Sequence, residues 1–257
     1  MLGAIAGDII GSVYEARPVR RKDFALFSPR STFTDDTVLT VAVADVLLNG
    51  GGYAAAFKRW FRRHPGRGFG GTFHAWAASA DMAPYGSFGN GAAMRVSPAG
   101  WAHDTLDEVL AEAARSAAAT HDHPEGVKGA QATAAAVFLA RTGHGRDAIR
   151  AYVEKTFGYD LHRTLDAIRP GYRFDVSCQG SVPESIICFL ESGGYEDAVR
   201  NAVSLGGDSD TMACIAGGIA EAFYGGVPDA VGDEAQRRLD GDLLAVVTAF
   251  RARFGVP

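Results

Sequence analysis

Residues 204–224, SLGGDSDTMACIAGGIAEAFY, constrain the fold more than any other part of the chain. Asp208 and Asp210 follow two glycines, and the ten residues after Asp210 carry no charge. A helix that is apolar on every side must be buried, and Gly217 and Gly218 would let another backbone approach it closely. Because unpartnered buried carboxylates are costly, acids at the start of such a helix suggest a cation between them.

Residues 34–48, TDDTVLTVAVADVLL, repeat this plan. Asp35 and Asp36 precede a largely apolar helix, just as Asp208 and Asp210 do. Each cluster alone is consistent with helix capping, because Asp, Ser and Thr are the usual N-cap residues and acids favour a helix N-terminus. Two doubled clusters that both lead into apolar helices favour a metal centre instead. Ligands that are all oxygen atoms suit Mg²⁺, Mn²⁺ or Ca²⁺ better than zinc.

The rest of the chain is predicted to be helical as well. Apolar residues recur at helical spacing within 106–117, 195–203 and 243–254, and no convincing alternating strand is present. We therefore expect an all-α fold, a compact orthogonal bundle of ten or more helices. No linker separates the two acid clusters, so residues 1–257 are expected to form a single domain.

Three local expectations concern where helices begin and end. Residues 2–14 are predicted to form one buried helix, which would place Asp8 and Glu15 on one face about two turns, or roughly 10 Å, apart. From this spacing Asp8 is expected to lie behind the metal ligands. Asp147 is expected to cap the helix that follows it. Pro183 is expected in the first turn of its helix, where proline is tolerated.

Charge and cysteine content exclude several classes of protein. The net charge is −5, and the basic runs at 17–22 and 58–64 are short and separate, so nucleic acid is not expected as a partner except as a modified substrate. The three cysteines show no paired metal spacing and suit a reducing cytoplasm. The N-terminal residues lack the basic region of a signal peptide, and no uncharged run is long enough to cross a membrane. We therefore expect a cytoplasmic monomer.

The segment GSFGNG at 86–91 is similar to an anion cradle, although a plain surface turn would look the same. Glycines let backbone N–H groups approach a phosphate, and Phe88 can stack on a base or simply pack. His121 and His123 flank Asp122, and a phosphate contact or a helix cap is expected there rather than a metal site. Glu15, considered alone, fits a solvated acid at a helix end.

Five segments occur together in a fixed order: GDIIGSVYE, FTDDT, GSFGNGAAMR, TH and LGGDSDT, which begin at positions 7, 33, 86, 120 and 205. This order resembles the ADP-ribosylglycohydrolase family, which includes the dinitrogenase reductase-activating glycohydrolases and the serine-ADP-ribose hydrolases. The resemblance implies a compact all-α domain with a binuclear centre of two divalent cations, Mg²⁺ or Mn²⁺.

The resemblance also implies roles for individual residues. The metal ligands would be Thr34, Asp35, Asp36, Asp208, Asp210 and Thr211. The substrate-binding loop would be Gly86, Ser87, Phe88, Gly89, Asn90 and Gly91, with His121 near the phosphate. Glu15 matches the glutamate at the reacting ribose and becomes the first catalytic candidate. Asp35 is the second, and the sequence does not decide which of these two carboxylates activates water.

The activity implied is that of an ADP-ribosyl hydrolase, which cleaves the C1″ linkage of an ADP-ribosylated protein or small molecule and releases ADP-ribose. The segments GSVYEAR and GSFGNG look closer to the serine-type branch than to the arginine-type branch. Arginine-linked ADP-ribose, O-acetyl-ADP-ribose and ADP-ribosylated nucleic acid stay open as substrates. Two other functions are considered: a non-catalytic ADP-ribose-binding protein, and a metal-dependent nucleotide phosphohydrolase that would release phosphate or AMP.

Overall fold

The computed structural model describes all 257 residues and consists of helices joined by loops, without a strand. The prediction of an all-α fold with ten or more helices is confirmed. The helices in chain order are α1 (Leu2–Gly11), α2 (Asp35–Asn49), α3 (Tyr53–Arg63), α4 (Gly71–Ala78), α5 (Gly91–Met94), α6 (Ser97–Ala102), α7 (Leu106–Ala118), α8 (Pro124–Arg141), α9 (Arg146–Phe157), α10 (Leu165–Ile168), α11 (Cys178–Leu190), α12 (Tyr195–Ser204), α13 (Ser209–Tyr224), α14 (Asp229–Arg237) and α15 (Gly241–Phe254). None of them is both long enough and apolar enough to cross a membrane.

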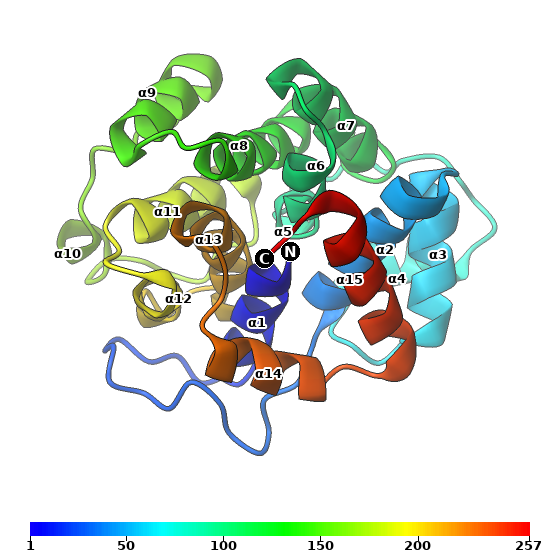
Figure 1. Ribbon diagram of the computed structural model, residues 1–257. Coiled ribbons are helices and arrows are strands. Elements are labelled where there is room, and N and C mark those ends of the chain that lie inside the picture. The colour runs from blue at the N-terminus through cyan, green and yellow to red at the C-terminus, as the bar shows by residue number, and fades with distance from the viewer.

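Helices α1 and α13 lie at the centre of the molecule and pack against each other along the whole length of α1 (Figure 1). A Cβ atom added at Gly3, Gly7 or Gly11 would fall 2.5, 2.1 or 2.4 Å from a backbone oxygen of α13, closer than real Cβ atoms approach. One added at Gly217 would fall 2.4 Å from the oxygen of Gly3. The two helices are therefore antiparallel with their backbones in direct contact, and the end of α1 lies beside the start of α13.

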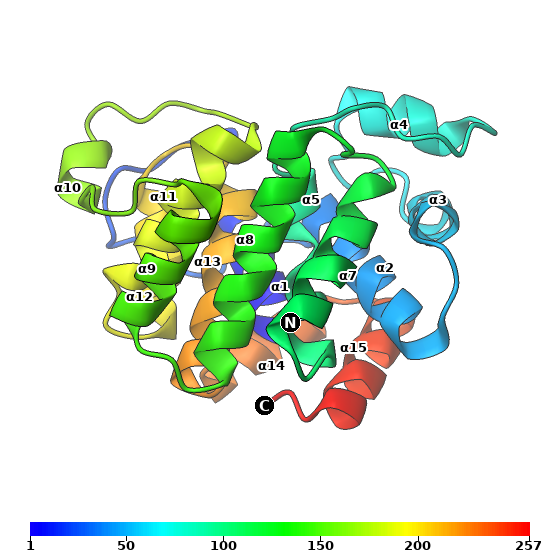
Figure 2. The same ribbon diagram turned by 90° about the horizontal axis from the view of Figure 1, so that it is seen from above.

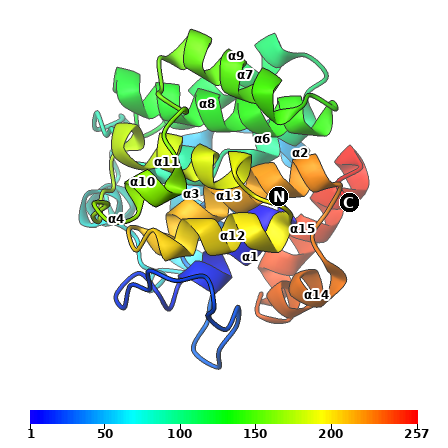
Figure 3. The ribbon, with the colours of Figure 1, turned by 90° about the vertical axis from the view of Figure 1, so that its left-hand side faces the viewer.

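The other helices surround this central pair. Helices α8, α11 and α12 pack on α13, whereas α14 packs on α1. Figure 3 shows α7–α9 as an upper layer above the central pair, and Figure 2 shows α4 at the edge of the molecule next to α3. Helix α2 packs between α3 and α15. The starts of α2 and α13 are thereby brought to the same region, although they are far apart in the sequence.

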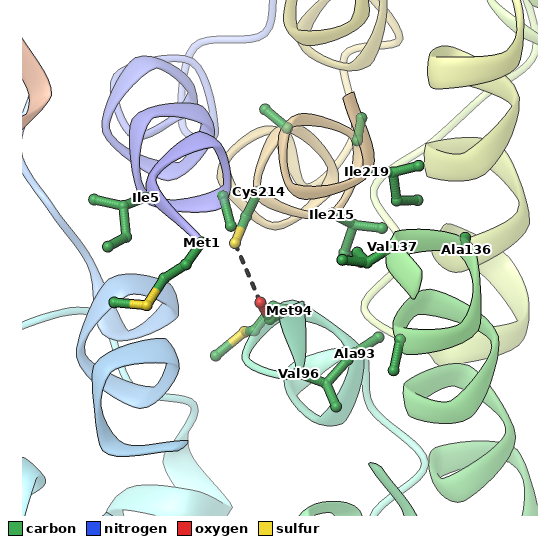
Figure 4. Packing of buried hydrophobic residues seen from close by; sticks show 14 of the residues in the cluster. Met1, Ile5, Ala93, Met94, Val96, Ala136, Val137, Cys214, Ile215 and Ile219 are labelled. Atoms are coloured by element: carbon green, nitrogen blue, oxygen red, sulfur yellow. Dashed lines mark hydrogen bonds between the residues drawn. The ribbon is translucent and has the colours of Figure 1, made fainter. Parts of the chain in front are cut away.

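The hydrophobic core is one cluster of 76 buried residues. Figure 4 shows the segment of Ala93, Met94 and Val96 next to α13 and α8, with the Met94 carbonyl oxygen facing Cys214 of α13. The buried Cys214 thiol donates a hydrogen bond to the Met94 carbonyl oxygen at 3.3 Å. Because α5 begins at Gly91, this anchoring fixes the end of the glycine-rich segment 86–91.

The predicted relation between Asp8 and Glu15 is wrong, because α1 ends at Gly11 and not at Tyr14. Gly11 is pressed against the backbone of α13, where a Cβ would lie 2.5 Å from the Cα of Asp210. After Ser12 the chain turns away, so Asp8 and Glu15 do not share a helix face.

Two predicted helix starts are also corrected. The N-cap of α9 is Gly145, and Asp147 is the second helical residue rather than the cap. Pro183 lies inside α11, because that helix begins five residues earlier at Cys178. Its N-cap is Ser177, whose hydroxyl oxygen accepts the N–H of Gly180 at 3.1 Å. A strong serine cap at this position starts the helix upstream of the proline.

Candidate metal centre

The first acid cluster is placed by the start of α2. Thr34 is the N-cap, and its hydroxyl oxygen accepts the N–H of Asp36 at 3.3 Å. Asp35 and Asp36 therefore occupy the first turn, where acids favour the helix dipole. The second cluster is different, because Asp208 immediately precedes α13 without capping it through its side chain. Helix capping thus explains the presence of Thr34, whereas the carboxylate of Asp208 is not used as a cap and is available to bind a cation.

Asp8 ties the end of α1 to the start of α2. Its carboxylate accepts hydrogen bonds from the Thr34 N–H at 3.0 Å, the Thr34 hydroxyl at 2.7 Å and the Thr37 N–H at 3.1 Å. The Thr37 hydroxyl donates a fourth. Burial raises the pKa of Asp8 to about 6 even though these four donors act in the opposite direction. Asp8 therefore holds Thr34 in place from behind.

Two groups of carboxylates meet at the junction of these three helices. Oxygens of Asp8, Asp36 and Asp210 lie within 4.8 Å of one another, and so do oxygens of Glu15, Asp208 and Asp210. Asp210 belongs to both groups. Thr211 links the two helix starts, because its hydroxyl donates to Asp36 Oδ2 at 3.3 Å.

The acids of this centre have no ion pair with a lysine or arginine, and they repel one another. Burial and then the charges of Asp8, Asp35 and Asp208 raise the pKa of Asp36 well above its usual range. The pKa of Asp210 is raised in the same way, by burial and then by Asp36 and Asp208.

The remaining acids shift in the same direction. Burial and then Asp8 raise the pKa of Asp35 to about 8. Glu15 lies at the exposed edge of the centre, and partial loss of solvation followed by the charges of Asp208 and Asp8 raises its pKa. Asp36 Oδ1 is buried without any hydrogen-bond partner. The carboxylate oxygens are clustered, no lysine or arginine neutralises them, and Asp36 Oδ1 has no donor. This combination fits a site for a hard divalent cation.

A cavity of about 350 Å³ opens from this centre and is walled on the opposite side by the glycine-rich segment. The predicted site residues that line it are Glu15, Thr34, Asp35, Asp36, Ser87, Gly89, Asn90, Gly91, His121, Asp208, Asp210 and Thr211. Gly86 and Phe88 do not line it. The N–H of Gly86 donates to Asp122 Oδ1 at 2.7 Å, and the Phe88 side chain is 48% exposed beside the ring of His123.

The glycine-rich segment is held by residues at and just before the start of α11. The Asn90 N–H donates to the Val176 oxygen at 2.7 Å, and the Cys178 N–H donates to the Phe88 oxygen at 2.9 Å. The Asn90 side chain donates to Asp208 Oδ2 at 2.8 Å, which joins the segment to the acid centre. An anion bound along the segment would therefore lie directly beside the acids.

His121 lines the cavity beside the glycine-rich segment. It is buried, and its Nδ1 lies 2.7 Å from the Thr120 hydroxyl oxygen. Burial and then the positive charge of Arg95 lower the pKa of His121 well below its usual range. A neutral imidazole at this position can donate one hydrogen bond without carrying charge.

Sequence reasoning missed a second glycine-rich wall of the cavity. Gly68, Gly70, Gly71, Thr72 and Phe73 line it at the start of α4. The Asp35 N–H donates to the Arg67 oxygen at 2.6 Å, so this loop crosses directly over the first acid cluster. The signal was present as a run of glycines just before a helix, the same feature that drew attention to 86–91. Arg95, which also lines the cavity, gave no such signal.

Fold and site together define a class: an all-α protein in which a buried, oxygen-rich acid centre adjoins a glycine-walled cavity. A sequence model of the ADP-ribosylglycohydrolase family matches residues 1–254, so the chain belongs to that family, whose members are hydrolases that act on ADP-ribosylated substrates.

Relatives support this placement. The chain is 29% identical to ADP-ribosylhydrolase ARH3 of Homo sapiens, a match that covers 95% of this chain and 90% of the relative. It is 26% identical to ADP-ribosylarginine hydrolase Tri1 of Pseudomonas putida, over 88% of this chain and 69% of the relative. A solved structure described as an ADP-ribosylglycohydrolase-related protein complex superposes with a TM-score of 0.70 at 26% identity, covering 98% of this chain and 96% of that one.

Proposed function

We propose that this protein is a metal-dependent hydrolase that cleaves the C1″ ribosyl linkage of an ADP-ribosylated protein or small molecule and releases ADP-ribose. The observation that carries the proposal is the buried acid centre without a cationic partner, in a cavity that two glycine-rich segments also line. Divalent cations would complement the acid centre, and the anionic diphosphate of a dinucleotide-like ligand would complement the glycine-rich segments. Family membership supplies the chemical class.

Two divalent cations, Mg²⁺ or Mn²⁺, are proposed for the centre. Asp210 lies close to Asp36 on one side and to Glu15 and Asp208 on the other, which supports two ion positions. The proposed ligands are Thr34, Asp35, Asp36, Asp208, Asp210 and Thr211. Bound there, the cations would polarise ribose hydroxyls and a water molecule.

The protein's own groups are proposed to bind, orient and transfer protons. Cleavage of a ribosyl bond develops oxocarbenium character, and a carboxyl group with a raised pKa can serve as general acid or base there. Glu15 has this property and lies at the exposed edge, where a leaving group can depart. Asp35, with its pKa raised to about 8, is the second candidate for activating water.

The glycine-rich segment 86–91 is proposed to bind the diphosphate. Ser87, Gly89, Asn90 and Gly91 line the cavity, and His121 would contact a phosphate oxygen. Gly86 adopts a φ of +66° and shapes the turn, since its own N–H is already paired. Exposed Phe88 is proposed to stack on the base.

Among linkages we propose serine-linked ADP-ribose first. The segments GSVYEAR and GSFGNG support this choice through their resemblance to serine-type members, and the similarity to ADP-ribosylhydrolase ARH3 extends over nearly the whole chain. The similarity to an arginine-linkage hydrolase makes arginine-linked ADP-ribose the main competitor.

The test is release of ADP-ribose from a panel of serine-linked peptide, arginine-linked peptide and O-acetyl-ADP-ribose, each with Mg²⁺, Mn²⁺ or chelator. We expect chelator-sensitive release of intact ADP-ribose, fastest from the serine-linked peptide. AMP or phosphate as product would instead indicate a nucleotide phosphohydrolase. Calorimetric binding of ADP-ribose without release from any substrate would indicate a non-catalytic binder.

We further propose that the chain acts as a cytoplasmic monomer and as a single domain. Three free and buried cysteines support a reducing compartment. One cooperative unfolding transition and a monomer mass in light scattering are expected.

A further inference from the structure

Arg95, at the end of α5, is an unusual residue for a protein interior. It is fully buried and lines the cavity, and its guanidinium carbon lies 4.2 Å from the centre of the Phe57 ring. No carboxylate pairs with it, and its Nε and Nη1 have no hydrogen-bond partner. Burial lowers the pKa of Arg95 to about 10, so it still carries its charge at neutral pH. Because a buried charge without a counter-ion is costly, its position calls for a role in the site.

The one side chain that Arg95 contacts through a hydrogen bond is Thr120. Arg95 Nη2 donates to Thr120 Oγ1 at 3.0 Å and to the Ser116 carbonyl oxygen at 2.8 Å. Thr120 Oγ1 in turn lies 2.7 Å from His121 Nδ1. These contacts form a continuous chain from the guanidinium through the hydroxyl to the imidazole.

The directions of these hydrogen bonds follow from the chemistry of the groups. A guanidinium can only donate, so Thr120 Oγ1 must accept from Arg95. The single hydrogen of the hydroxyl then points at His121 Nδ1, its nearest acceptor at 2.7 Å, whereas the Tyr85 hydroxyl also lies beside Thr120 but forms no hydrogen bond of normal geometry with it. If Nδ1 were protonated instead, the buried hydroxyl hydrogen would lose this short hydrogen bond. Nδ1 therefore accepts, and the ring proton resides on Nε2.

Nε2 of His121 points at the glycine-rich segment. A Cβ added at Gly91 would fall 3.2 Å from Nε2, and one added at Gly89 would fall 3.6 Å from it. No protein group accepts from Nε2, and the ring borders the cavity. The fixed tautomer thus directs an N–H group at the position where an anion on the segment would lie.

We propose that Arg95 and Thr120 are positioning residues that hold His121 as the Nε2–H tautomer, so that it donates to an anionic diphosphate on the glycine-rich segment. The other tautomer would turn a lone pair towards the phosphate oxygens and repel them. This inference rests on the proposed function for the identity of the ligand, but the tautomer itself is a property of the free protein.

The tautomer is measured by long-range ¹H–¹⁵N correlation on protein with ¹⁵N-labelled histidine, with the His121→Asn variant to assign the signal. We expect a pyridine-type Nδ1 and a pyrrole-type Nε2 at neutral pH. A protonated Nδ1, in either the other tautomer or an imidazolium ion, overturns the proposal. This arm needs no substrate, so it is decided separately from the proposed function, which fails if the wild-type protein does not bind ADP-ribose.

Variants test the chain of contacts. Thr120→Val removes the hydroxyl at nearly constant volume and should produce a mixture of tautomers, with about tenfold weaker ADP-ribose binding (about 1.4 kcal/mol) and unchanged adenosine binding. Thr120→Ser should restore both properties. Thr133→Val is the matched control, because Thr133 is also a buried threonine but has no hydrogen-bond partner for its hydroxyl, and it should change neither property.

Arg95→Met tests the far end of the chain. Without the guanidinium, the Thr120 hydroxyl oxygen no longer has to accept from Arg95 and is free to accept from Nδ1–H, so the Nδ1–H tautomer should become populated. If Arg95→Met does not fold, Thr120→Val decides the proposal. An unchanged His121 tautomer together with unchanged ADP-ribose affinity in Thr120→Val overturns it.

Discussion

Replacement of Gly7 by alanine should damage the proposed metal centre from inside the core. Gly7 faces α13, and a Cβ added there would lie 2.1 Å from the Ala213 oxygen. To restore an ordinary contact distance of 3.4 Å, α1 and α13 must separate locally by about 1.3 Å. The obstacle is the main chain of α13, so no flexible side chain can rotate away to relieve the contact.

The expected size of the effect combines two opposing contributions. Alanine is favoured over glycine inside a helix by about 1 kcal/mol. Overpacking of a close-packed interior costs about 1–3 kcal/mol, and the upper part of that range applies to a backbone obstacle. We therefore expect a net loss of about 1–2 kcal/mol in the free energy of unfolding.

The separation should reach the metal site as well. Asp8 is the next residue of α1, and its carboxylate lies within 4.8 Å of those of Asp36 and Asp210. Because ligand constellations tolerate displacements of only about 0.5 Å, Mn²⁺ affinity should fall at least tenfold. Urea unfolding in chelator measures the first effect, and calorimetric Mn²⁺ titration measures the second.

Gly241→Ala is the matched control, since Gly241 is also a helical glycine but nothing lies within 4 Å of an added Cβ. It should leave the stability unchanged or slightly higher and the Mn²⁺ affinity unchanged. If Gly7→Ala is destabilised but binds Mn²⁺ normally, the spacing of α1 and α13 does not set the site. If neither quantity changes, the close backbone contact does not exist in solution.

Three further outcomes are expected. Glu15→Gln should keep ADP-ribose binding in calorimetry but lose turnover by about 10²-fold or more, and retained turnover would exclude Glu15 as acid or base. Asp210→Asn should abolish chelator-sensitive activity with unchanged helical circular dichroism; full activity would remove Asp210 from the ligand set. Without metal, thermal stability should fall as the pH rises from about 5 to about 8. The pKa values of Asp8 (about 6) and Asp35 (about 8) are raised, so the folded state retains protons that the unfolded chain has released. Saturating Mg²⁺ should remove this slope, and a flat profile in chelator would contradict the assigned repulsion.

The acid clusters could be found from the sequence because the unusual feature, acids directly before an uncharged run, lies within a few residues. Asp208 and Asp210 stand before a run without charge, and the resulting conflict between burial and ionisation can be recognised without coordinates. The support from Asp8 was expected on the basis of helix spacing. The same spacing failed for Glu15, because the end of α1 at Gly11 is fixed by contact with α13 and not by any stop signal that a helix pattern contains.

The sequence predicted that another backbone would approach α13 closely at Gly217, but it did not indicate that this backbone would be α1. The glycines of α1 recur every fourth residue, yet only the packed structure reveals that this face meets α13. Gly218 was expected to serve in the same way, but its nearest neighbours are side-chain atoms of Ser97 and Ala4. The short helices α6, α10 and α14 were not predicted, because four to nine residues hold too few apolar repeats to identify.

Arg95 marks the limit of sequence reasoning in this chain. An arginine near a turn is ordinarily exposed, and only its complete burial at the cavity wall makes it informative. The same packing that buries it, through α5 and the adjoining core, also fixes Gly91 at the end of the glycine-rich segment. One short helix therefore places both the positive charge and the backbone that would receive an anion.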